Sequence, residues 1–262
     1  MSNLPAGILP GPFGVCRFGD CLPLIECRKK QRLPKEPRSI IVALFPWYAG
    51  EFFSRNVALY AVGDDYHRLV GGFLDRACQS LRELFPGAAF APFVDSSPIR
   101  EVEAAHLAGL GAIGRNGLLL HEAFGSRVFI GEIVTDLELS PSPSPQTDCA
   151  GCNRCVEACP TGALGGKLDK SLCRSAITQK KAPLSAWEES EIRQGGLVWG
   201  CELCQSCCPY NENPVTTPIE EFRENPVPVV TADNLSAILP QKTYSYRGEG
   251  VLRRNLLLLN NR

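Results

Sequence analysis

Nine of the thirteen cysteines in this chain lie between residues 149 and 208, with a spacing suited to redox chemistry. Four of them form the run Cys149-x2-Cys152-x2-Cys155-x3-Cys159, which Pro160 follows. Bacterial ferredoxins use this run, in which three thiolates bind one 4Fe–4S cluster and the fourth binds the other. A zinc site needs only two Cys-x2-Cys pairs and no Cys-Pro ending, so the spacing predicts iron–sulfur clusters.

A second group consists of Cys173, Cys201-x2-Cys204 and Cys208, with Pro209 after it. Crossed ligation assigns the cysteines to two clusters. Cluster one then takes Cys149, Cys152, Cys155 and Cys208, and cluster two takes Cys159, Cys173, Cys201 and Cys204. Cys207 also has ligand spacing from Cys204. The proline after Cys208 favours Cys208 as the ligand and leaves Cys207 as a buried free thiol.

Strands and helices must position these groups, and their pattern predicts an α+β fold. Residues 39–46 and 88–94 are typical of core strands, as are residues 127–135. An amphipathic helix is expected over 66–85, and a second begins at Pro98 with Ser97 as its cap. We expect a first domain over 1–139, a linker at 140–148, a two-cluster domain over 149–215, and a tail over 216–262 with a helix at 251–261.

Composition narrows the classes of partner. The 262 residues carry 27 basic and 28 acidic side chains, so the net charge of −1 provides no overall attraction to nucleic acid or to an anionic membrane. The chain has no stretch of about 18 apolar residues, so the sequence predicts no membrane span. Residues 1–18 lack a basic start followed by an apolar run, so we expect no targeting segment and a cytoplasmic protein. In a reducing compartment, cysteines serve more often as metal ligands than as disulfides.

Beyond the cysteines, four segments make the chain resemble the epoxyqueuosine reductase family. They are YAVGDDYH (60–67), VDSSPIRE (94–101), AGLGAIGRNGLLL (108–120) and GSRVFIGEIVTDLEL (125–139). The long gap before WGCELCQSCCPYN (199–211) matches as well. The resemblance implies an α/β cobalamin-binding domain followed by a ferredoxin-like domain with two 4Fe–4S clusters. It also implies a catalytic role for Asp95, and Tyr66, Asn116 and Ser175 as residues close to the cobalamin.

The chain departs from this family at several positions. Val102 stands where the family usually has Arg, Ala112 where it has Trp, and Arg115 where it has Lys. Typical members continue into a helical-repeat region associated with tRNA binding, and residues 251–261 look like its first helix only. We therefore expect a short form that holds tRNA less firmly.

Three assignments have a plainer alternative. Asp95 is either an acid, with a pKa raised by an apolar, enclosed site, or a polar residue that caps the following helix. His67 is a possible cobalt ligand, but an ordinary polar role suits a single histidine better. Cys16, Cys21 and Cys27 suggest a further metal or redox site, although their spacing matches no tight metal loop.

The expected function is a cobalamin-dependent oxidoreductase that reduces epoxyqueuosine to queuosine in tRNA. Electrons would come from an external donor such as flavodoxin or ferredoxin, and the substrate would be tRNA or a modified nucleoside. Two other readings remain open: an electron carrier or reductive activator for a corrinoid protein, and a reductase of a small molecule. The basic segment 27–38 and the arginines of the tail are the candidate phosphate contacts.

Overall fold

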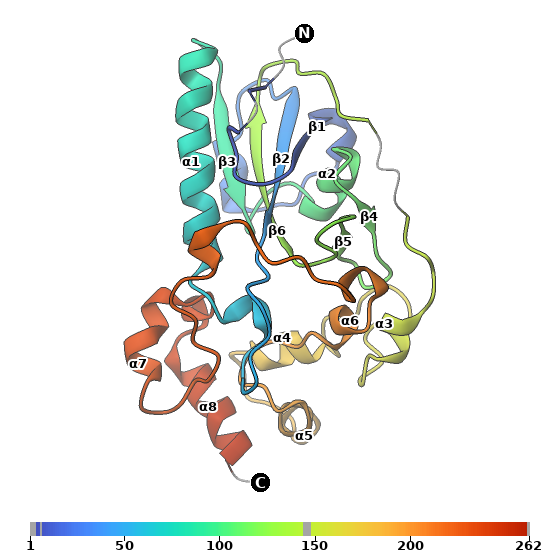
Figure 1. Cartoon of the computed structure of the whole chain (residues 1–262), viewed down its shortest axis with the longest axis vertical. Helices are drawn as coiled ribbons and strands as arrows, with labels where there is room; N and C mark the ends of the chain where they lie inside the picture. The colour runs from blue at the N-terminus through green and yellow to red at the C-terminus, as the bar shows by residue number, and fades with distance from the viewer. Residues whose placement is uncertain (1–3, 6, 144–147, 261–262) are drawn as a thin grey trace. The chain divides into compact units, whose positions relative to one another are not determined.

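The computed structural model describes residues 4–5, 7–143 and 148–260, and the chain forms two compact units. Unit 1 comprises residues 1–47 and 66–150, and unit 2 comprises 48–65 and 151–262. Of the linker expected at 140–148, residues 144–147 lie outside the described part. Figure 1 traces the elements of both units.

Unit 1 is built on a four-stranded antiparallel sheet in the order β1-β2-β6-β3. Its strands are β1 (Phe13–Arg17), β2 (Ser39–Pro46), β3 (Phe90–Val94) and β6 (Val128–Thr135). A short hairpin pairs β4 (Ala112–Ile113) with β5 (Leu119–Leu120). The helices are α1 (Tyr66–Leu84) and α2 (Glu101–Leu107), with 3-10 turns η1 (Phe18–Cys21) and η2 (Arg28–Arg32). The expectation of mixed α and β structure is confirmed.

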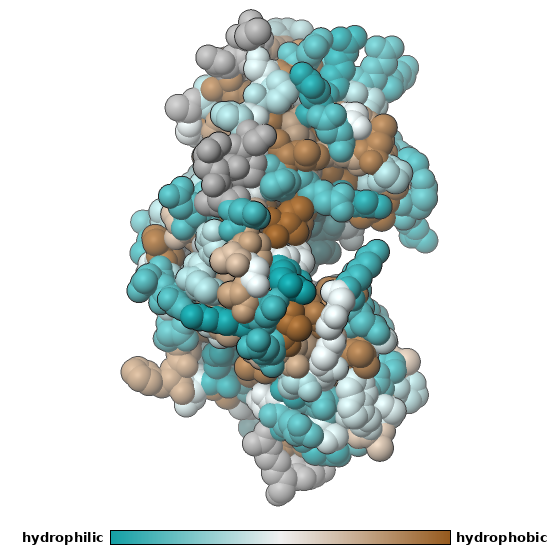
Figure 2. Space-filling view, turned by 90° about the vertical axis from the view of Figure 1, so that its right-hand side faces the viewer, coloured by the Kyte–Doolittle hydropathy of each residue, from teal (hydrophilic) through white to brown (hydrophobic). Residues whose placement is uncertain are grey.

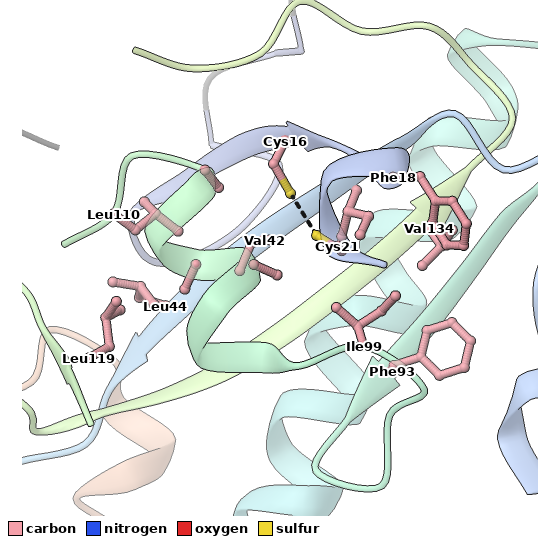
Figure 3. Packing of buried hydrophobic residues seen from close by; sticks show 14 of the residues in the cluster. Cys16, Phe18, Cys21, Val42, Leu44, Phe93, Ile99, Leu110, Leu119 and Val134 are labelled. Atoms are coloured by element: carbon pink, nitrogen blue, oxygen red, sulfur yellow. Dashed lines mark hydrogen bonds between the residues drawn. The ribbon is translucent and has the colours of Figure 1, made fainter. Parts of the chain in front are cut away.

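Alternation along the strands directs side chains to opposite faces of the sheet. On one face, Phe45 of β2 stacks on Phe73 of α1 with ring centroids 5.7 Å apart. On the other face, Val42 and Leu44 pack in a cluster with Ala104 of α2. Figure 3 shows this second core, in which side chains from β1, β2, β3 and α2 meet. The two helices therefore cover opposite faces of one sheet (Figure 1).

The second predicted helix begins later than expected. α2 starts at Glu101 with Arg100 at its N-cap, so Ser97 does not cap it. The hydroxyl of Ser97 instead donates to Oε2 of Glu132 and accepts the backbone N–H of Ile99. This tertiary partner lies 35 residues away, which local spacing does not reveal.

Unit 2 consists of short helices joined by ordered loops. They are η3 (Leu59–Ala61), α3 (Arg154–Glu157), α4 (Arg174–Thr178), α5 (Ala186–Gly195), α6 (Leu203–Ser206), η4 (Pro209–Asn211), η5 (Glu220–Phe222), α7 (Leu235–Ile238), η6 (Leu239–Gln241), η7 (Ser245–Arg247) and α8 (Glu249–Asn260). The helix expected at 251–261 is thus present as α8. Asn255 anchors it by donating to the backbone oxygens of Thr178 and Val198.

Residues 48–65 cluster with unit 2, although they were predicted to belong to the first domain. Val57 bridges to Trp199, and both belong to an apolar cluster that includes Tyr244. Lys242, which is 1% exposed, pairs with Asp64 at 3.1 Å and donates to the backbone oxygen of Asn225 at 2.8 Å. Apolar burial and this ion pair hold residues 48–65 against residues that come more than 130 positions later in the sequence.

On the face drawn in Figure 2, the exposed hydrophobic residues form separate small areas among hydrophilic residues. No helix in the described part of the chain is long and apolar enough to cross a bilayer.

Candidate functional site

Asp95 sits in the loop that follows β3, with a side chain that is 55% exposed. Its backbone has φ 56°, in the left-handed region, which aspartate tolerates better than most residues. The first residues of α1 face it. The hydroxyl of Tyr66 lies 3.5 Å from Oδ1, and Nε2 of His67 lies 3.5 Å from Oδ2. A short aromatic stack supports this pair, since Tyr66 lies between His67 and Phe129 with centroids 4.0 Å from each.

These neighbours lower the pKa of Asp95. The interaction with His67 contributes most, and Lys29 and Tyr66 add to it against the opposing effect of burial. The expected apolar, enclosed environment is therefore wrong for this structure: Asp95 is half-exposed and surrounded by groups that favour its charged form. The alternative of a helix cap fails as well, because α2 begins six residues later.

Asn116 and Ser175 already have partners within their own units. Asn116, 6% exposed, accepts the backbone N–H of Leu118 and so closes the turn between β4 and β5. Ser175, on α4 of unit 2, bonds with the phenol of Tyr60 and with Gln179. Within unit 1, the hydroxyl of Tyr66 lies beside Asp95.

The cysteines of unit 2 lie on tight turns and at helix ends. Gly151 and Asn153 adopt positive φ (63° each) on either side of Cys152, and α3 then carries Cys155. Cys173 precedes α4, and Cys204 lies on α6. α3 and α6 contact one another. Both ligand runs are therefore loops that wrap into a short helix, with the two helices adjacent.

Electrostatic coupling shows which thiols are neighbours. Cys201 interacts with Cys159 and Cys173, and Cys204 interacts with these three and with Cys207. Burial, followed by the charges of these thiols, raises the pKa of Cys204 to about 12. Apart from Cys207, these thiols are the ones that the sequence assigned to cluster two.

Cys207 has neighbours in both ligand runs. It interacts with Cys155, Cys208 and Cys152, and its thiol donates to the backbone oxygen of Cys204 at 3.6 Å. Cys149 belongs to unit 1.

The thiols suit an iron–sulfur cluster because cysteine thiolates are the ligands that hold its irons. At Cys159, burial opposes ionisation, but hydrogen bonds from the side chain of Thr161 and from backbone N–H groups outweigh it and lower the pKa of the thiol. Hydrogen bonds of this kind tune iron–sulfur centres. Within residues 4–5, 7–143 and 148–260, no three Cys, His, Asp or Glu side chains close on a site for a single metal ion.

The early cysteines have a structural setting. Cys16 of β1 and Cys21 of η1 are buried with their sulfurs 3.7 Å apart (Figure 3). Cys27 lies at the N-cap of η2 and is half-buried. Cys16 and Cys21 pack into the α2-side core rather than forming a third ligand loop.

Sequence reasoning missed two carboxylates below the Asp95 loop. Glu132 of β6 is fully buried, and Glu101 begins α2. A signal was available: Glu132 interrupts the otherwise apolar strand VFIGEIVT. An acidic residue at an inward-facing strand position is costly to bury and calls for a specific reason.

Two parts of the chain match known sequence families. Residues 28–96 match the family described as Epoxyqueuosine reductase QueG, DUF1730. Residues 148–211 match the 4Fe-4S double cluster binding domain. The cysteine-rich part of unit 2 is therefore an iron–sulfur domain for two 4Fe–4S clusters.

Curated relatives are epoxyqueuosine reductases. The protein from Gloeobacter violaceus is 38% identical over 158 residues, which are 60% of this chain and 50% of the relative. The protein from Cyclobacterium marinum is 35% identical over 190 residues, or 69% of this chain and 61% of the relative. The chain spans about half the length of the curated relatives it matches.

Solved structures share the fold. Epoxyqueuosine reductase from Streptococcus thermophilus superposes with a TM-score of 0.80 at 22% identity, over 96% of this chain and 77% of that one. An epoxyqueuosine reductase bound to an epoxyqueuosine-modified tRNA-Tyr stem loop gives 0.81 at 22% identity, with the same coverage. The resemblance found in the sequence is confirmed.

Proposed function

We propose that this chain, a relative of the epoxyqueuosine reductases, is a cobalamin-dependent iron–sulfur reductase that converts epoxyqueuosine in tRNA to queuosine. The observation that carries the proposal is the Asp95 site: a carboxylate with a phenol and an imidazole at its two oxygens, in the same chain as a double-cluster domain. Such a combination joins a proton source to an electron supply.

Removal of an epoxide oxygen as water consumes two electrons and two protons and leaves a carbon–carbon double bond. The electrons would enter from an external flavodoxin or ferredoxin and pass through the two clusters. Cluster one would be held by Cys149, Cys152, Cys155 and Cys208, and cluster two by Cys159, Cys173, Cys201 and Cys204. Support for the second set is the mutual proximity of its four thiols in unit 2.

Cobalamin, when bound, supplies the low-potential, strongly nucleophilic cobalt that such a reduction needs. The surface around Asp95 suits a large cofactor because it is open and has an aromatic wall, formed by Tyr66 on Phe129. Tyr66 would stand at the edge of the cofactor. Asn116 and Ser175 would shape its surroundings through the turn and the helix they hold.

Asp95 would deliver a proton to the departing oxygen. Its neighbours keep the carboxylate charged in this structure, so the proton would be held between Oδ2 of Asp95 and Nε2 of His67. The Tyr66 hydroxyl, at Oδ1, would keep the carboxylate oriented. Solved relatives include an epoxyqueuosine reductase described with its aspartate catalytic loop swung out of the active site. We propose that the Asp95 loop is its counterpart.

The test is anaerobic reconstitution with iron, sulfide and cobalamin, followed by assay of epoxyqueuosine-containing tRNA and of the free nucleoside. Asp95→Asn should retain iron and cobalamin but lose about 10²–10⁴ in rate, because an amide cannot donate a carboxylic proton. Turnover of neither substrate by the loaded wild-type protein would remove tRNA from the proposal. Failure to retain cobalamin, with clusters intact, would favour an electron carrier.

A further inference from the structure

Two carboxylates that the proposed reaction does not use lie beneath the Asp95 loop. Glu132 occupies the middle of β6, where its register partners are Phe93 on one side and Val42 on the other. Its exposure is 0%. Figure 3 shows the apolar side chains of Val42, Phe93 and Ile99 that form this region of the core. Glu132 is therefore an acid placed inside a hydrophobic cluster.

Both carboxylates are bonded to the loop. The hydroxyl of Ser97 donates to Oε2 of Glu132 at 2.5 Å, which is short for a hydrogen bond. Glu101 accepts the backbone N–H of Asp95. The loop also closes on itself, since the N–H of Ser97 bonds to the backbone oxygen of Asp95 at 2.5 Å. The two acids thus hydrogen-bond to the turn in which Asp95 has a positive φ: Glu101 bonds to Asp95 and Glu132 bonds to Ser97.

The surroundings do not support two negative charges. Burial raises the pKa of Glu132 to about 7, and burial together with the charges of Glu132 and Asp95 raises the pKa of Glu101. Lys29 is the cation that acts on Glu101, while the thiols of Cys16 and Cys21 are the titratable groups that β1 and η1 bring to Glu132.

One carboxylate oxygen of each acid has no hydrogen-bond partner among the described residues. Within the described part of the chain, Oε1 of Glu101 and Oε1 of Glu132 are buried without a hydrogen-bond partner. A buried acceptor without a partner is costly, and two interacting carboxylates with buried oxygens cannot both ionise cheaply. One retained proton relieves the repulsion between them.

We propose that Glu101 and Glu132 together retain one proton at neutral pH and act as positioning residues for Asp95 by holding its loop. The positioning role rests on the proposed function, in which Asp95 is the proton donor.

Infrared spectroscopy tests the retained proton without any assay of activity. At pH 7 the exposed carboxyl groups are ionised, so a protonated carboxylic C=O band reports a buried acid. We expect this band in the wild-type protein, and we expect it to be absent in Glu101→Gln/Glu132→Gln and retained in the matched control Glu103→Gln. Glu103 lies on the same helix but is 52% exposed. A wild-type protein without the band, or a double variant that keeps it, would overturn the proposal.

Hydrogen exchange tests the positioning role. In Glu101→Ala the backbone amides of residues 94–97 should exchange at least tenfold faster, and in Glu101→Gln most of the protection should return because the amide oxygen still accepts a hydrogen bond. If these amides exchange in Glu101→Ala at the same rate as in the wild-type protein, Glu101 does not position the loop. If the enzyme also turns over epoxyqueuosine, Glu101→Ala should lower kcat with KM unchanged. Because the spectra and the exchange rates need no substrate, they separate failure of this inference from failure of the proposed function.

Discussion

Nε2 of His67 lies 3.5 Å from Oδ2 of Asp95, and this pairing is the largest single influence on the Asp95 carboxyl. The interaction favours the charged carboxylate and so lowers its pKa. An acid that must be protonated to act is active on the acidic side of its pKa. His67 therefore limits the pH range over which Asp95 stays protonated.

Replacing His67 should move the pH dependence of turnover. In His67→Ala the pKa of Asp95 should rise, since its main stabilising partner is lost, and the acidic limb of the rate profile should extend to higher pH. His106→Ala is the matched control, because that histidine contacts the backbone oxygen of Gly111 and is not among the groups that lower the pKa of Asp95. A profile in His67→Ala that overlays the wild-type curve would contradict this role.

The two adjacent cysteines should respond differently to substitution. Cys207→Ser should leave about eight irons in the reconstituted protein, because its thiol is engaged with the backbone oxygen of Cys204. Cys208→Ser should lose about half of them, since Cys208 is the assigned ligand of cluster one. Iron and sulfide analysis with electron paramagnetic resonance checks both variants. Loss of iron in Cys207→Ser but not in Cys208→Ser would make Cys207 the ligand and Cys208 the free thiol.

Lys242→Met should destabilise the protein by about 3 kcal/mol. The ammonium group is buried and bonds to Asp64 and to three backbone oxygens, so its removal leaves buried acceptors without a donor. Lys30→Met is the control. It removes an exposed pair with Glu26 and should cost no more than about 1 kcal/mol. Denaturant unfolding measures both, and equal losses would show that Lys242 does not hold segment 48–65.

Lys29 should contribute to tRNA binding. Its ammonium group lies 3.4 Å from the backbone oxygen of Val94, next to Asp95, so a phosphate near the reacting base would meet it. Lys29→Glu should weaken tRNA binding and reduce the salt dependence by about one charge. Lys30→Glu should have a smaller effect, because Lys30 already pairs with Glu26.

Lys167→Glu, an exposed reversal in unit 2, serves as the control for non-specific attraction. Equal weakening by Lys29→Glu and Lys167→Glu would mean that only overall charge matters. The tail arginines are engaged within unit 2, since Arg253 pairs with Glu249 and Arg254 donates to the backbone oxygen of Lys180.

The cysteine pattern by itself determined the iron–sulfur domain. Ligand runs of three to four residues are local, so their spacing along the chain is also their spacing around a cluster. Strand 39–46 was recognisable for a similar reason: burial on both faces of a sheet demands near-continuous apolar residues, and this segment has them.

Contacts between distant residues were decided only by the tertiary structure. Nothing near Asp64 in the sequence indicates Lys242 as its partner, and nothing near Ser97 indicates Glu132. The free energy of these contacts comes from excluding water at points where the folded chain returns to itself, and that path depends on the whole sheet and its helices. Asp95 illustrates the division: its position after a strand was readable in the sequence, but its exposure and its pairing with His67 were properties of the fold.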